Sequence, residues 1–181
     1  MKKIPVLAAF AAIITLTGCR SSEQVYDKLY LRGAAITGKS GKTAVFTFYD
    51  EENKSFSGWG DDLNEICRNA ELSTGKSLFT GHTEIIVLGD CDFSETLGFL
   101  LTQWKISPSC LVVYGGVNAA QVMKSNDTES LADSVKRAVQ QGKAPECDVI
   151  TVLSGLTGDS GRAEVPRIGS NGFQGTKEMH R

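Results

Sequence analysis

One short apolar run bounded by glycines places the tightest constraint on how this chain can fold. Residues 85–88 are all branched or large aliphatics, and they lie between Gly81 and Gly89. A strand with one solvent-facing side would alternate apolar and polar residues, so an unbroken run indicates a strand buried on both faces. Such a strand needs cover on both sides of its sheet, and the flanking segments provide helices for that purpose.

Those flanking segments carry apolar residues at helical spacing. Residues 63–70 and 93–104 place an apolar side chain at every third or fourth position, which predicts two amphipathic helices. Asp92, followed three positions later by Glu95, is the pattern of a helix N-terminal cap. A second apolar strand is predicted at residues 110–114. We therefore expect a single α+β domain in which helices cover a mixed β-sheet.

The segment before this centre predicts a β-hairpin. Residues 28–32 and 42–49 are rich in β-branched and aromatic types, and the Gly-rich stretch 37–41 between them is a turn signal. The polar stretch that follows, residues 50–60, is predicted to be a loop that holds Trp59.

After the centre, the pattern becomes helical and then weakens. Short helices are predicted at residues 117–124 and from Asn126 to a stop at Gly142. Residues 147–153 fit either a strand or the start of a helix, because so short a run does not distinguish the two. From Ser154 onwards the chain is Gly-rich and polar, which predicts a linker or the opening of a further domain.

The N-terminus has the layout of an export signal. Two lysines precede residues 4–17, an uncharged run that is shorter than the roughly 20 apolar residues of a membrane span. The run ends in an aliphatic residue, two small residues and Cys19, the order of a bacterial lipobox, in which a diacylglycerol joins the cysteine sulphur and a peptidase cuts before it. The sequence predicts a lipoprotein signal peptide at residues 1–18 and lipidation of Cys19. A plain secretory signal with an incidental cysteine is the alternative.

A phosphate-loop pattern at residues 33–40 lacks the structure that its chemistry needs. Phosphate binding requires a helix that begins at the lysine, but a strand-forming run follows Ser40. The net charge of -2 and the absence of a basic stripe also argue against nucleic-acid binding. We expect neither a nucleotide nor a nucleic acid as partner.

The residues capable of catalysis or metal binding are isolated from one another. His82 has only Glu84 as a nearby carboxylate, and no nucleophile motif accompanies it. We therefore expect no catalytic residue, no cofactor and no metal site. Four further cysteines follow Cys19, and they are Cys67, Cys91, Cys110 and Cys147. Their spacing does not suit a zinc site. An even number of cysteines in an exported chain permits disulfides, although some of these residues fit core positions.

The same residues resemble a known family. A leucine-phenylalanine pair, one further residue, glycine-histidine and an apolar strand ending in glycine occupy residues 78–89. With the lipobox and the strand at residues 29–36, this is similar to the N-terminal domain of the Ger(x)C lipoproteins, the C subunits of bacterial spore nutrient-germinant receptors. The resemblance implies such an α+β domain at residues 19–153. Residues 154–181 would then be a linker or the truncated start of the family's second domain.

The resemblance implies a non-catalytic receptor subunit that acts in spore germination. Its partners would be polytopic membrane subunits of the A and B types, and its lipid would hold it on the outer face of the cytoplasmic (spore inner) membrane. The alternative is a generic exported lipoprotein that binds a small ligand, which requires a deep pocket with convergent polar groups. An exported hydrolase would require His82 within hydrogen-bond reach of a serine or carboxylate in a cleft.

Overall fold

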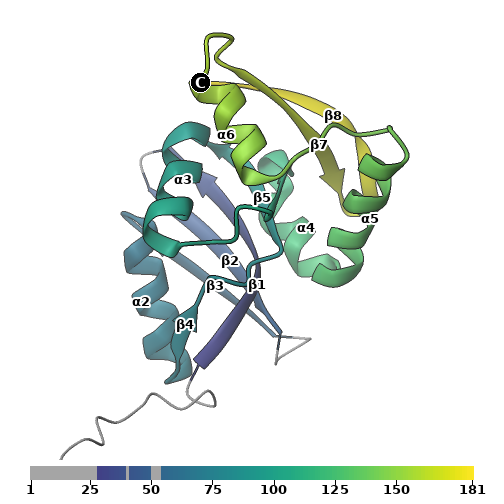
Figure 1. Ribbon diagram of the computed structural model, residues 1–181. Coiled ribbons are helices and arrows are strands. Elements are labelled where there is room, and N and C mark those ends of the chain that lie inside the picture. Colours follow the sequence, from purple (N-terminus) through teal and green to yellow (C-terminus); the bar gives the residue numbers. More distant parts are fainter. Residues whose placement is uncertain (1–27, 40, 50–53) are drawn as a thin grey trace, which may run out of the picture.

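A mixed sheet runs through the centre of the computed structural model, which describes residues 28–39, 41–49 and 54–181 (Figure 1). Within those ranges its eight strands have the order β3-β2-β1-β5-β6-β7-β8, and β4 pairs with the beginning of β1. The strands are β1 (Lys28–Gly38), β2 (Lys42–Phe48), β3 (Ser55–Gly60), β4 (Ser77–Phe79), β5 (Ile85–Cys91), β6 (Leu111–Tyr114), β7 (Arg162–Gly169) and β8 (Gly172–His180). Strands β1, β5, β6 and β7 are parallel, whereas β2, β3 and β8 run antiparallel to their neighbours. The expected α+β fold with a mixed sheet is confirmed.

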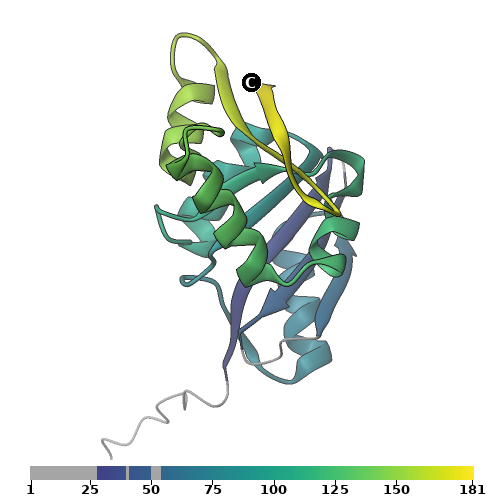
Figure 2. The same cartoon turned by 90° about the vertical axis from the view of Figure 1, so that its right-hand side faces the viewer.

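Helices cover both faces of this sheet. They are α2 (Leu63–Thr74), α3 (Phe93–Phe99), α4 (Ala119–Ser125), α5 (Thr128–Gln140) and α6 (Val149–Thr157). Helices α2 and α3 lie on one face, and α4 lies on the other (Figure 1). Figure 2 shows α5 alongside the β7–β8 hairpin. In the described part of the chain, no helix is long and apolar enough to cross a bilayer.

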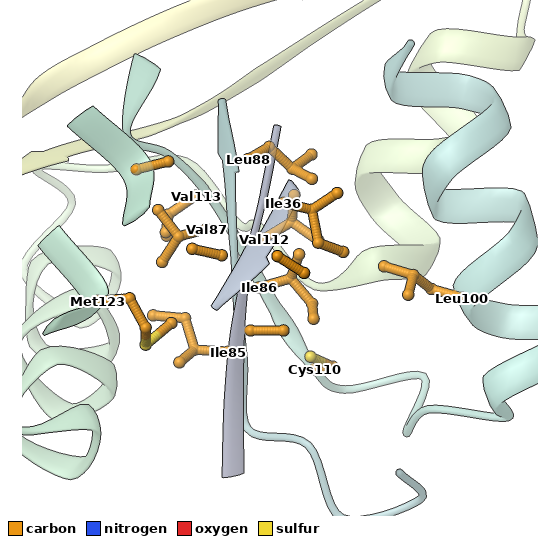
Figure 3. Close-up of a cluster of buried hydrophobic side chains, with 14 of the residues drawn as sticks. Ile36, Ile85, Ile86, Val87, Leu88, Leu100, Cys110, Val112, Val113 and Met123 are labelled. Carbon is orange, nitrogen blue, oxygen red and sulfur yellow. The ribbon is translucent and has the colours of Figure 1, made fainter. Parts of the chain in front are cut away.

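The predicted central strand is buried on both faces. All side chains of residues 85–88 have 0% exposure. Val87 points to the side of Met123 on α4, whereas Ile86 lies on the other side of the sheet with Leu100 (Figure 3). The period of two in a strand directs neighbouring side chains to opposite faces, which is why the run has no polar member.

Aspartates begin four of the helices. Asp92 caps α3 as predicted, and its carboxylate accepts a hydrogen bond from the Glu95 N–H at 2.8 Å. The carboxylate satisfies an amide that has no partner within the helix. The other helices capped in this way begin after Asp62, Asp127 and Asp148.

Two local predictions differ from the structure. Residues 55–60 form β3 and not a loop, and Phe56 packs against Phe46 with ring centroids 6.0 Å apart. Serines and glycines at four of its six positions weaken the sequence signal of β3. The helix predicted at residues 93–104 changes to a π-helical turn at Leu100–Trp104, and Lys105 ends it with a φ of 52°.

The C-terminal segment is also more regular than the sequence suggested. The ambiguous residues 147–153 contribute to α6, and Arg162–His180 form a β-hairpin where a linker was expected. Its apolar side chains Val165, Ile168 and Met179 are buried. Gly172 lies at the turn with a φ of 88°, and Gly175 has a φ of 115° within β8, beside a shift in the hairpin register. A domain limit at residue 153 stays a prediction. The predicted signal peptide, residues 1–18, and Cys19 lie outside the described residues.

Candidate interaction surface

Polar and aromatic side chains gather where the N-terminal ends of β1 and β5 approach each other. On β1, Leu29 and Leu31 are buried beneath the sheet, so Tyr30 and Arg32 project from its opposite face. Segments distant in sequence complete this surface, which we call the Arg32 surface. Its members are Tyr30, Arg32, Tyr49, Phe79, His82, Glu84 and Glu129.

Arg32 is held by two carboxylates and an aromatic ring. Its Nη2 lies 2.7 Å from Glu129 Oε2, and its Nε lies 3.6 Å from Glu84 Oε2. The guanidinium carbon stands 4.9 Å from the ring centroid of Tyr49, a cation–π contact. Burial by itself lowers the pKa of Arg32, but the bond to Glu129 and the charges of Glu84 and Glu129 outweigh it, so this pKa is raised. The cation is therefore fixed in place and permanently charged.

Tyr49 connects this ion pair to the loop before β5. Its hydroxyl lies 2.9 Å from Glu84 Oε1 and 2.9 Å from the carbonyl oxygen of His82, and it can donate to either. Burial, followed by the hydrogen bond and charge of Glu84, raises the pKa of Tyr49 to about 12. A phenol that keeps its proton so firmly is a structural donor near neutral pH and a poor general acid.

Three rings continue the surface toward the start of β1. Tyr30 and Phe79 lie on paired positions of β1 and β4, with centroids 5.4 Å apart. His82 packs against both rings, at 6.4 Å from Tyr30 and 5.2 Å from Phe79. Lys28 Nζ is 5.9 Å from the Phe79 centroid. The cluster thus presents aromatic area beside positive charge.

A glycine determines how closely α5 approaches this surface. Thr128, the first residue of α5, donates a hydrogen bond of 2.8 Å to Thr47 on β2. Thr47 in turn lies 3.3 Å from the carbonyl oxygen of Gly33. A Cβ on Gly33 would come within 2.7 Å of the Thr128 methyl group. The missing side chain therefore lets α5 settle on β1 and bring Glu129 to Arg32.

Among the described residues, His82 lacks the serine or carboxylate partner in a cleft that a hydrolase would require. His82, Glu84, Ser107 and Ser109 border one hollow of about 250 Å³. Within the described ranges, however, the His82 ring packs against the rings of Tyr30 and Phe79, and the two serine hydroxyls lie 2.8 Å from each other. Glu84 is engaged by Tyr49. No pairing of nucleophile with base is assembled in this part of the chain.

Other sequence candidates prove to be structural. The phosphate-loop pattern falls on the β1–β2 hairpin, where β1 continues through Gly38 and β2 begins at Lys42, so no helix starts there; Ser40 lies outside the described residues. Gly38 has a φ of 104°, which explains the glycine by turn geometry. Trp104 is buried, whereas Trp59 is 66% exposed. No cluster of His, Cys, Asp or Glu suited to a metal occurs in the described ranges.

The four cysteines of the described domain are free thiols, and Cys67 is the only one of them that is half-buried. Burial raises the pKa of Cys67 to about 12 and that of Cys147 to about 11, and it also raises the pKa of Cys91 and Cys110. Thiols of this kind are poor nucleophiles, because the reactive form is the thiolate.

Sequence reasoning did not identify Arg32, Tyr49 or Glu129 as members of one site. The only local signal was the alternation of Tyr30 and Arg32 with buried leucines, which indicates that both project from one face of a strand. Nothing local indicates which other segments meet them there. The predicted lipidation site, Cys19, lies outside the described residues, so no geometry bears on it.

Comparison with known proteins identifies one family. A family model described as the spore germination protein N-terminal domain matches residues 12–170. The matched range contains Cys19, the whole Arg32 surface, α6 and β7. No curated protein and no solved structure matches the chain.

Proposed function

The chain belongs to the family of spore germination protein N-terminal domains, and from this we propose that it is a non-catalytic, lipid-anchored subunit of a nutrient-germinant receptor. The observation that carries the proposal is the extent of the family match. It begins within the apolar run ahead of Cys19 and continues through β7. The lipobox and the folded domain therefore fall within a single family unit.

Lipid on Cys19 would hold the domain on the outer face of the cytoplasmic membrane, which is the inner membrane of the spore. Two acyl chains anchor a protein stably, whereas one chain binds only marginally, since each buried CH₂ contributes about 0.8 kcal/mol. The proposed partners are polytopic receptor subunits of the A and B types, which reside in the same bilayer.

The Arg32 surface supports a role in binding proteins more than a role in chemistry. Tyrosine and arginine are enriched at protein interfaces, where a ring or a guanidinium provides contact area and hydrogen bonds together. Here Arg32 is already oriented by Glu129, and Tyr49 by Glu84. A preorganised surface loses less side-chain entropy when a partner binds.

Replacing Cys19, the proposed lipidation site, tests the proposal. We expect Cys19→Ala to move the protein from the membrane to the soluble fraction and to abolish the response of spores to nutrients. Cys67→Ala, a change at a half-buried thiol of the domain, should leave both properties intact. Co-purification of the lipidated protein with polytopic subunits should be lost in the Cys19 variant. Uncleaved Cys19→Ala protein that stays in the membrane would instead show anchoring by an unprocessed helix.

Capture of a small ligand is the second candidate function. A hollow of about 370 Å³ lies between β2 and the α4–α5 turn, and its lining includes Thr47, Asn126 and Asp127. This volume is within the range of ligand sites, roughly 300–1,000 Å³. Mass spectrometry of small molecules released when the purified protein is denatured would support this candidate. Asn126→Leu should then abolish retention of the molecule without reducing membrane attachment.

A further inference from the structure

β3 lies at one end of the sheet, and no strand among the described residues pairs with its outer edge. It ends the strand order next to β2, with which it pairs over all six of its residues without a register shift. In an antiparallel pair, alternate residues direct their backbone N–H and C=O groups away from the neighbouring strand. β3 therefore offers a row of these groups to one further strand.

Helix α2 packs against one face of β3 and supports the strand. A Cβ on Gly58 would come within 2.9 Å of the Ile66 side chain on α2. Because side chains alternate along a strand, Ser55, Ser57 and Trp59 project from the opposite face, where all three are exposed. The strand thus has one supported face and one exposed face made mainly of small side chains.

Trp59, the largest exposed side chain of β3, lies away from the outer edge. A Cβ on Gly41, the residue before β2, would come within 3.3 Å of Trp59 Nε1. The indole therefore leans over the turn between β1 and β2, which is on the inner side of β3. A further strand can approach the outer edge without displacing this ring.

The opposite edge of the sheet, β8, is protected in ways that β3 is not. β8 carries Lys177, Glu178 and His180, and its pairing with β7 shifts register beside Gly175. Charged side chains and irregular positions at an edge hinder pairing with other chains. β3 contains neither a charged residue nor a proline, and its pairing has no such shift. β3 is therefore the edge of this sheet that is suited to accept another strand.

We propose that β3 pairs in the antiparallel direction with β3 of a second copy of this chain, so that the two sheets join into one. A two-fold axis would pass close to Ser57 and Gly58, the middle of the strand. Such an axis brings each residue near it opposite its own copy. Small uncharged residues meet there without a clash and without repulsion between like charges. The pairing is independent of the proposed lipid on Cys19.

The charges that flank β3 favour this arrangement. Lys54 precedes the strand, whereas Asp61 and Asp62 follow it. In an antiparallel pair, the start of one strand lies opposite the end of the other, so the acidic end of each copy faces Lys54 of the other copy and the two acidic ends stay apart. Lys54 already has a contact within its own chain, and the pairing requires no new ion pair. A parallel pairing would instead bring the acidic ends together.

Measurement of the oligomeric state tests the proposal on the full chain in detergent. A pair of six-residue strands is a small interface, below about 1,200 Å², so we expect a reversible dimer in sedimentation equilibrium. Ser57→Lys places like charges at the axis and should raise the dissociation constant about fivefold or more. Thr176→Lys adds the same charge at an exposed position of β8 and should leave the constant unchanged. Thermal unfolding of both variants checks that they fold.

Crosslinking locates the contact independently of the affinity. Ser57→Cys would bring two thiols together across the axis, with Cβ atoms about 5–8 Å apart. Ser55→Cys is the matched control on the same exposed face, because its two copies would lie at least about 13 Å apart. We expect a short bismaleimide to crosslink the position 57 variant at least about tenfold faster than the position 55 variant. The parent protein gives the background from its own thiols.

Three results would overturn the proposal. The first is a chain that stays monomeric up to about 1 mM, since even weak specific interfaces are populated at that concentration. The second is a dimer that Ser57→Lys and Thr176→Lys weaken equally, or that crosslinks equally at positions 55 and 57, because its interface would lie elsewhere. The third is a position 57 thiol that crosslinks in membranes only to a different polypeptide, which would assign the edge of β3 to another partner.

Discussion

The guanidinium of Arg32 on β1 and the carboxylate of Glu129 on α5 lie 2.7 Å apart. The two partners have different surroundings, because the Arg32 side chain is 11% exposed and that of Glu129 is 61% exposed. A largely buried cation depends on its partners, whereas an exposed carboxylate is well solvated without one.

Substitution of these two residues should therefore have unequal effects. We expect Arg32→Ala to lower the free energy of unfolding by about 1–3 kcal/mol, because it removes the packing on Tyr49 and leaves Glu84 without its cation. Glu129→Ala should lower it by less than about 1 kcal/mol. Urea unfolding of the purified variants measures both, and equal losses would contradict the account.

Gly33 should be sensitive to the addition of a single methyl group. Gly33→Ala places a Cβ within 2.7 Å of the Thr128 methyl and 3.1 Å of Thr47 Oγ1, so we expect destabilisation by about 1–3 kcal/mol from overpacking. Gly98→Ala is the control, because no atom outside its chain neighbours and its own helix backbone lies within 4 Å of its Cβ position, and the residue is in α3. Alanine should stabilise that helix by roughly 0.5–1 kcal/mol. Thermal unfolding should show opposite shifts for the two variants.

Stability should fall in alkaline solution, in part through Tyr49. Its pKa is about 12 in the folded protein, against an ordinary value of 10.0. Below pH 10 the phenol is protonated in both states, and between pH 10 and 12 only the unfolded chain loses the proton, so unfolding becomes more favourable as pH rises. Tyr49→Phe should flatten this part of the curve in urea titrations. The thiols of Cys67 and Cys147 titrate in the same region in both proteins, so the difference between the curves isolates Tyr49, and parallel curves would rule out its contribution.

The cysteines of the domain should react slowly with thiol reagents while the protein is folded. Their exposed area is small and burial raises their pKa, so little thiolate is available at pH 8. We expect modification by an aromatic disulfide reagent at least about tenfold slower in buffer than in urea, with Cys67 reacting first, since it is half-buried. Four thiols should be accessible in urea without reductant. A smaller number would reveal a disulfide.

The parts of the fold that local patterns encode strongly could be predicted from the sequence. Residues 85–88 form an unbroken apolar run, the apolar stripe of α2 has a clear helical period, and Asp92 marks its helix by a cap. The β7–β8 hairpin was missed because its glycines, which serve its turn and an irregular position within β8, resemble a linker in composition. β3 was missed for a similar reason, since two serines and two glycines leave Phe56 and Trp59 as its only strand-favouring residues.

The Arg32 surface depends on contacts between distant segments, which no local period encodes. Arg32 lies on β1, Tyr49 follows β2 and Glu129 lies on α5, and only the packing of α5 on β1 unites them. The sequence pattern at Gly33 suggested a phosphate loop, whereas the structure explains this glycine by the close approach of Thr128. The glycine was informative in the sequence, but the reason for it is a tertiary contact that the local pattern does not reveal.

The position of β1 in the sheet has a consequence for the order in which the chain can assemble. β1 is synthesised before every other described strand, yet it occupies an interior place. Its hairpin partner β2 follows at once, but its other edge waits for β4 and β5, the latter beginning at Ile85. Until they emerge, a strand carrying Leu29, Leu31 and Ile36 has an open edge that can pair with another chain. Nascent chains halted between β2 and β4 should thus be the species most prone to aggregation and most in need of chaperones.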